Sequence, residues 1–245
     1  MTVSQDEQKI GIAMGKVLIK DHTEVKEIYI YKKNNENRFE LDKMRDFDNP
    51  HACITFQFWN QNSNYLLFFT MESIFKFNYQ DEASEEETIY NISSENILKD
   101  IPKFGVFSKD QRKCIITSTQ DILYINMDTR KEIDFDDREG ISAIQNILSN
   151  ETHFFVLANK KDHKLGYYLF SFEIENPTKD AIYYINWNNK LDIGDCDLHF
   201  MHEKQKDGSQ LDCIVVSYKC IGINTFNVFV IDLKTKLIKY WHEGY

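Results

Sequence analysis

The chain has 245 residues, of which 42% are hydrophobic and 14% aromatic, and this composition predicts a globular rather than a disordered protein. Its net charge of −10 at pH 7 repels phosphate backbones and argues against general nucleic-acid binding. No apolar run reaches the length of a transmembrane helix, and the polar, acidic N-terminus does not resemble a signal peptide. We therefore expect a globular protein that binds neither nucleic acid nor a membrane.

The five cysteines show no spacing typical of a metal site or a redox pair. They are Cys53, Cys114, Cys196, Cys213 and Cys220. Their number is odd, and several stand within apolar runs, as buried reduced thiols do. This pattern predicts a cytoplasmic protein, with the nucleus left open as an alternative.

The first expected structural unit covers residues 9–47. Lys9–Met14 and Lys16–Lys20 are predicted to form its first two strands. Glu27–Lys32 alternates between apolar and polar residues, which is typical of a half-buried third strand. Arg38–Leu41 begins the fourth strand.

The second unit covers residues 52–92 and has a stronger strand pattern. Cys53–Trp59 and Ile74–Tyr79 alternate in polarity, and Thr88–Ile92 closes the unit. Tyr65–Thr70 between them is a continuous apolar run, which predicts a strand buried on both faces.

The third unit, residues 103–135, is the clearest copy of the pattern. Four short β segments follow one another, each ended by a polar turn: Lys103–Asp110, Lys113–Ser118, Asp121–Asn126 and Lys131–Phe135. Such a repeated strand–turn–strand pattern decides the architecture before any single residue does.

The fourth unit, residues 143–186, and the fifth, residues 196–241, repeat the pattern with longer strands. Asp128 and Asp232 are predicted to lie in the same turn, between the third and fourth strands, two units apart. Their separation gives about 50 residues per unit, close to the period of a four-stranded propeller blade. The sequence therefore predicts an all-β fold and a single domain spanning residues 1–245.

The third unit resembles a divergent WD-repeat β-propeller blade. Phe107–Asp110 and Thr117–Asp121 resemble the first two turns of that family's blade, and the second contains its frequent Asp at Asp121. Asn126–Asp128 stands where the Trp-Asp pair would stand, with Met127 in place of Trp, and Ile231–Asp232 repeats this in the fifth unit. No Trp-Asp or Gly-His dipeptide occurs, so of the family's hydrogen-bond network only Asp121 and Ser118 carry over.

This resemblance implies a propeller of about five four-stranded blades, either closed on itself or part of a larger or incomplete ring. It also implies a non-enzymatic scaffold for protein or peptide partners, without a cofactor. Two alternatives stay open. One is a glycosidase-type propeller with Asp195 and Asp197 as carboxylates near the axis. The other is an incomplete propeller or β-sandwich that a partner chain completes.

Two further local patterns are worth testing. Ser84 lies in an acidic loop and is followed by three glutamates, which is a pattern that acid-directed kinases favour. His199, His202 and Glu203 stand close together, but strand residues three apart point to opposite faces. We therefore predict a phosphorylation site at Ser84 and no metal site.

Overall fold

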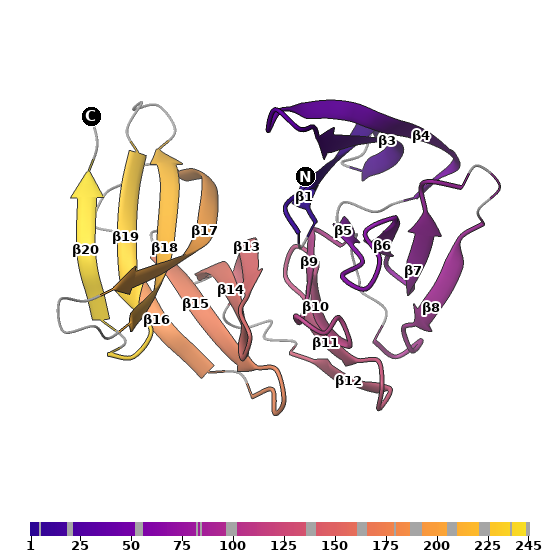
Figure 1. The fold of residues 1–245 in the computed structure, drawn as a ribbon. Helices are drawn as coiled ribbons and strands as arrows, with labels where there is room; N and C mark the ends of the chain where they lie inside the picture. The colour runs from indigo at the N-terminus through magenta and orange to yellow at the C-terminus, as the bar shows by residue number, and fades with distance from the viewer. Residues whose placement is uncertain are drawn as a thin grey trace. The chain divides into compact units, whose positions relative to one another are not determined.

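The computed structural model describes residues 1–4, 6–18, 22–51, 56–81, 83, 85–96, 102–135, 141–160, 166–178, 180–186, 193–204, 210–220, 226–235 and 237–243. This part of the chain contains strands and no helix, and therefore no helix that could cross a membrane. The strands form five four-stranded antiparallel sheets, each built from four consecutive strands (Figure 1). The predicted fold class, an all-β chain of about five four-stranded propeller blades, is confirmed.

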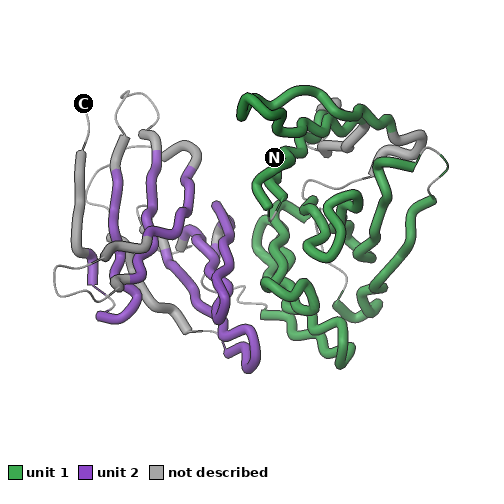
Figure 2. Tube along the Cα trace, viewed as in Figure 1, with its two compact units in different colours: residues 1–136 green, residues 137–245 purple. Residues whose placement is uncertain are grey.

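The chain divides into two compact units, Met1–Asp136 and Asp137–Tyr245 (Figure 2). The first unit holds three sheets, here called blades A to C, and the second holds blades D and E. The single domain expected over residues 1–245 stays a prediction.

The strands of the first unit have the following bounds. Blade A comprises β1 (Thr2–Val3), β2 (Lys9–Leu18), β3 (His22–Lys33) and β4 (Phe39–His51). Blade B comprises β5 (Phe56–Phe58), β6 (Tyr65–Phe69), β7 (Ser73–Asn78) and β8 (Glu87–Asn91). Blade C comprises β9 (Phe104–Phe107), β10 (Lys113–Thr117), β11 (Ile122–Asn126) and β12 (Lys131–Asp134).

The second unit has longer strands. Blade D comprises β13 (Ile141–Ser149), β14 (His153–Lys160), β15 (Gly166–Glu173) and β16 (Asp180–Asn186). Blade E comprises β17 (Ile193–Lys204), β18 (Gln210–Cys220), β19 (Phe226–Asp232) and β20 (Leu237–Glu243).

Blade B is packed on both faces, as the continuous apolar run of β6 predicts. Because successive strand residues point to opposite faces, Leu66 and Phe68 face one way and Leu67 and Phe69 the other. Leu66 and Phe68 pack with blade A, and Leu67 and Phe69 pack with blade C. All four side chains are at most 1% exposed. Consecutive blades of this unit therefore pack face to face.

The second unit is built in the same way. Phe155 and Leu157 of β14 pack against Ile214 and Val216 of β18 in one buried cluster that joins blades D and E. Phe229 on β19 adds to this cluster and stacks on Tyr218, with their ring centroids 5.8 Å apart.

Blade A differs from its prediction at its first strands. Lys9–Leu18 is one strand, β2, whereas two strands meeting near Gly15 were expected. Met14 pairs with Glu27 and Gly15 with Val25, so a β-bulge on β3 bends the pair where a turn was expected. The first strand of the blade is β1, and the blade begins at Thr2 instead of Lys9.

Candidate functional site

The turns between the first and second strands, here called first turns, have the same structure in blades A and C. In blade C, the Ser108 hydroxyl donates to Asp110 Oδ1 at 2.6 Å and accepts from the Lys113 N–H at 3.1 Å. Asp110 Oδ1 also accepts from the Arg112 N–H at 3.1 Å. Burial opposes ionisation of Asp110, but these hydrogen bonds and the nearby cations outweigh it and lower its pKa.

The first turn of blade A repeats this geometry atom for atom. The Ser4 hydroxyl donates to Asp6 Oδ1 at 2.6 Å and accepts from the Lys9 N–H at 2.9 Å. The Gln8 N–H donates to Asp6 Oδ1 at 3.1 Å. The hydrogen bond from Ser4 is the main cause that lowers the pKa of Asp6. The shared spacing Ser-x-Asp-x-x-Lys was the sequence signal that could have placed the start of blade A.

One residue of each turn has a left-handed backbone. Glu7 and Gln111 occupy the same position, each with φ of 56°. For residues other than Gly, Asn and Asp, this left-handed conformation costs conformational free energy. Tertiary contacts must therefore compensate for that cost at such a position.

Gln111 makes such contacts with the preceding blade. Its Nε2 donates to the Phe58 carbonyl at 2.8 Å, and its Oε1 accepts from the Asn60 N–H at 2.6 Å. Asn60 Nδ2 in turn donates to the Lys109 carbonyl at 2.9 Å. The first turns of blades B and C are therefore fixed to each other.

A second link joins the first turns of blades A and B. Lys9 Nζ donates to Asn64 Oδ1 at 2.9 Å and lies 5.6 Å from the ring centroid of Tyr79. The turns Ser4–Lys9, Trp59–Tyr65 and Ser108–Lys113 thus form one hydrogen-bonded row, here called the turn row. Its exposed side chains are those of Asp6, Glu7, Gln8, Asn60, Gln61, Asn62, Asn64, Lys109, Asp110 and Arg112.

The turn between the second and third strands of blade C contains the predicted Asp121. The Ser118 hydroxyl donates to Asp121 Oδ2 at 2.7 Å and accepts from the Asp121 N–H at 3.2 Å. In blade B, Thr70 takes the same role, since its Oγ1 accepts from the Ser73 N–H at 2.9 Å. Asp121 therefore closes a local turn.

Asp128 and Asp232 both lie at the turn between the third and fourth strands of their blades. They do not occupy equivalent positions within it, which corrects how the two turns were aligned from the sequence. Asn126 Oδ1 accepts from the N–H groups of Asp128 and Thr129, each at 3.1 Å. Asp232 Oδ1 accepts in the same pattern from the N–H groups two and three residues further on, at 2.8 and 3.2 Å. Asp232 therefore corresponds to Asn126, and a short acceptor side chain caps the turn in both blades.

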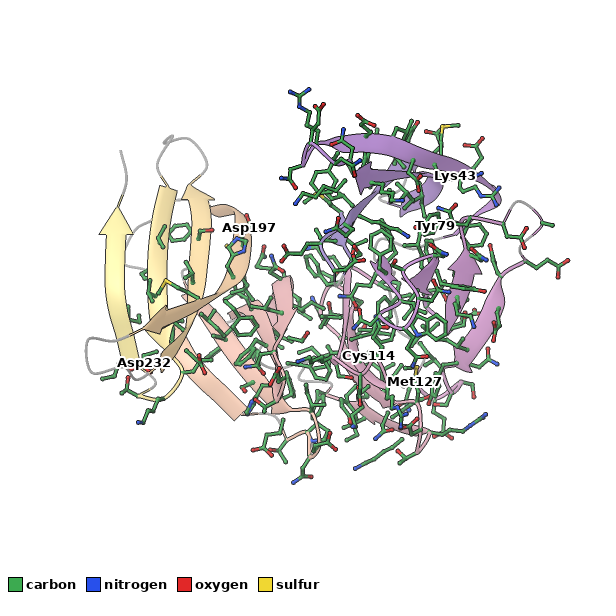
Figure 3. The ribbon with its side chains drawn as sticks, in the orientation of Figure 1. Lys43, Tyr79, Cys114, Met127, Asp197 and Asp232 are labelled. Carbon is green, nitrogen blue, oxygen red and sulfur yellow. The ribbon has the colours of Figure 1, made fainter. Side chains whose placement is uncertain are left out.

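A backbone hydrogen bond identifies the residue of blade E that is equivalent to Met127, which is labelled in Figure 3. The Met127 N–H donates to the Arg112 carbonyl at 2.9 Å, and the Leu233 N–H donates to the Asp212 carbonyl at 3.0 Å. Leu233, and not Ile231, therefore takes the place of Met127 in blade E. Asp128 Oδ2 lies 3.3 Å from Arg112 Nη1, and both side chains are largely exposed.

A carboxylate joins the outer strands of blades B and C. Glu132 on β12 accepts from the Tyr90 hydroxyl at 2.8 Å, from the Ser93 hydroxyl at 2.6 Å and from Asn96 Nδ2 at 2.9 Å. Burial opposes ionisation of Glu132, but the hydrogen bonds outweigh it and lower its pKa. Burial, and then the bond to Glu132, raises the pKa of Tyr90. No sequence pattern pointed to this contact.

Of the remaining predicted site residues, the structure describes the side chain of Asp197 and not those of Asp195 and Ser84. The Asp197 side chain is exposed on β17 (Figure 3), and the side chain of Asp195 lies outside what the structure describes. Ser84 also lies outside the described residues. Among the described residues, no group of three His, Cys, Asp or Glu side chains could hold a metal ion.

Three of the cysteines are described in full, namely Cys114, Cys196 and Cys213. All three are buried and carry free thiols, and burial raises the pKa of Cys114. A buried thiol with a raised pKa is a poor nucleophile, so Cys114 has the character of a core side chain.

No family model matches the chain, and no curated protein sequence matches it. Solved structures do. One is core factor of S. cerevisiae, with a TM-score of 0.58 and 8% identity over 91% of this chain and 37% of that one. Another is a putative 6-phosphogluconolactonase of Bacteroides fragilis, with a TM-score of 0.53 and 12% identity over 99% of this chain and 83% of that one.

An oligogalacturonate lyase of Vibrio parahaemolyticus is also similar, with a TM-score of 0.50 and 11% identity over 99% of this chain and 63% of that one. Identities this low show the fold alone, and the chain spans little more than a third of the core factor chain. The similarities support blades of propeller type, while membership of the WD-repeat family stays a prediction.

Proposed function

We propose that this chain is a protein-interaction scaffold without catalytic activity of its own, and that it binds protein or peptide partners through the turn row. The observation that carries the proposal is the hydrogen bonding between turns of consecutive blades, as at Gln111 and Lys9. Turns that are already held in place lose little conformational freedom on binding, so more of the contact energy remains as affinity.

The chemistry of the row indicates the kind of partner. Asp6 and Glu7 make its blade A end acidic, the amides of residues 60–62 form its middle, and Lys109 and Arg112 lie at its blade C end. Amides both donate and accept, as a peptide backbone requires. The net charge of −10 favours basic segments over nucleic acid or anionic membranes. The buried, reduced cysteines fit a cytoplasmic location.

A site-specific photo-crosslinker tests the proposal in the cells that express the protein. It is placed at Gln61 in the turn row and, as a matched control, at Glu72 in the turn at the opposite end of the same blade. We expect a discrete protein adduct from position 61 and none from position 72. The protein identified by mass spectrometry is then purified and titrated against the chain.

The purified partner should bind at physiological salt, and Gln61→Ala with Asn62→Ala should weaken binding by roughly tenfold or more. Unchanged affinity in that double variant, or equal crosslinking from both positions, contradicts binding through the turn row. Affinity capture without any specific protein contradicts the scaffold function itself.

A further inference from the structure

Blade A has an apolar outward face, on the side away from blade B, whose side chains are half-buried or exposed. Strand pairing places Ile12, Tyr29 and Met44 in one row across this face, and Ile10, Tyr31 and Leu41 in the next. Met44 is 48% exposed and Leu41 is 55% exposed. On the inward face of the same blade, Ile28 and Ile30 are fully buried against blade B.

The outward face is equivalent to a face that is covered elsewhere in the unit. The Lys33 N–H donates to the Gln8 carbonyl at 2.8 Å, as the Met127 N–H does to the Arg112 carbonyl, and this bond aligns blades A and C. Ile10 and Ile12 of blade A then correspond to Cys114 and Ile116 of blade C. Those two residues are 0% exposed and pack against blade B. The outward face of blade A therefore has the same pattern of apolar residues as a face that packs against another β-sheet.

Charged residues of opposite sign flank the two apolar rows, one sign at each end of this stretch of β3. Glu27 and Asp46 pair across the strands at one end, next to Met14. Lys33 pairs with Phe39 at the other end. The Tyr29 hydroxyl donates to Glu27 Oε2 at 2.8 Å and holds that carboxylate at the edge of the apolar rows.

We propose that the outward face of blade A binds the same face of a second copy of this chain, in a two-fold symmetric dimer. The axis lies between the two sheets, perpendicular to β3, and passes between the rows of Tyr29 and Tyr31. It turns the second copy so that strands run antiparallel, and each row meets the other row of its partner. Met44 then packs on the second copy's Leu41, and Ile12 on its Ile10.

The same axis brings Glu27 of each copy opposite Lys33 of the other, because these residues lie equally far from the axis along β3. The contact is isologous, so each ion pair forms twice. Two sheets packed face to face at about 10 Å, with their strands nearly aligned, are a common arrangement for apolar faces. None of the residues named in this interface is an exposed side chain of the turn row, and the dimer stands independently of the proposed function.

Sedimentation velocity over a range of chain concentrations tests the dimer. We expect a reversible dimer for the wild-type chain. Glu27→Lys or Lys33→Glu alone should weaken association at least about tenfold, because each places two like-charged pairs in the interface. The double variant Glu27→Lys/Lys33→Glu should restore it, since it re-forms both pairs with exchanged partners.

Glu72→Lys is the matched control, because it makes the same charge change on an exposed turn of blade B, and it should associate like the wild type. Three outcomes overturn the proposal: a monomer at every concentration, a dimer that both single reversals leave unchanged, or a double reversal that fails to restore association. If the wild-type chain is a monomer, thiol labelling of a Leu41→Cys variant would then show whether the same chain covers this face.

Discussion

Blades A and C share the same first turn and equivalent faces, yet only one of these faces is covered. Phe107, next to the turn of blade C, is 3% exposed, whereas its counterpart Val3 in blade A is 48% exposed. Gln111 is buried and bonded to blade B, whereas Glu7 at the same turn position is exposed. The turn is thus specified locally, while burial of the face depends on what packs against it.

The largest effect should separate the two faces of blade A. Ile30→Ala removes a fully buried side chain and should lower the free energy of unfolding by about 2–5 kcal/mol. Leu41→Ala on the outward face should change it by no more than about 0.5 kcal/mol. Both are measured by urea denaturation in a Glu27→Lys background, at a protein concentration where sedimentation shows a monomer. A comparable loss for Leu41→Ala would show that the outward face is covered within one chain.

The left-handed turn residues should respond to glycine with opposite signs. Gln111→Gly relieves backbone strain but leaves the Phe58 carbonyl and the Asn60 N–H without their partner, and should destabilise by about 1–3 kcal/mol. Glu7→Gly relieves the same strain without that loss and should stabilise by up to about 1 kcal/mol. Arg130→Gly, at an exposed residue with φ of 54°, is the control and should behave like Glu7→Gly. Loss of stability in Glu7→Gly would mean that Glu7 has a partner of its own.

The outer strands of blades A and C should differ in their response to acid. Glu132 pairs with Ile125 and Leu41 pairs with Tyr31, so Leu41 takes the place of Glu132 in blade A. The pKa of Glu132 is lowered in the folded state from its ordinary 4.5. Its contribution to stability is therefore complete above that value and is lost as the pH falls through the lower, folded pKa.

Unfolding measured between about pH 6 and pH 3 should show a smaller acid-induced loss in Glu132→Gln than in the wild type. Glu40→Gln, at an exposed carboxylate beside Leu41, is the matched control for the removal of one carboxylate. A wild-type profile in the Glu132→Gln variant would mean that the bonds from Tyr90, Ser93 and Asn96 do not hold the carboxylate in solution.

The features that follow from local chemistry were accessible from the sequence. The apolar run at β6 and the polar turns of blade C gave the strands and the four-stranded units, because pairing and alternation are periodic. The bulge on β3 opposite Gly15 was not accessible, since a glycine within an apolar stretch fits a turn equally well. The bond from Gln111 to blade B and the cluster at Glu132 join residues about 40 to 50 positions apart, which no local pattern encodes.

The smallest expected difference is between the two aspartates of the matching turns. Asp6→Ala and Asp110→Ala each remove an acceptor of one hydroxyl and one backbone N–H, and each should cost about 0.5–1.5 kcal/mol. Because Ser4 and Ser108 hold these carboxylates within their own turns, the two losses should agree within about 0.5 kcal/mol. Urea denaturation of the two variants side by side measures this. A clearly larger loss for Asp110→Ala would show that the covered face of blade C also stabilises its turn, so that turn and face are not specified separately.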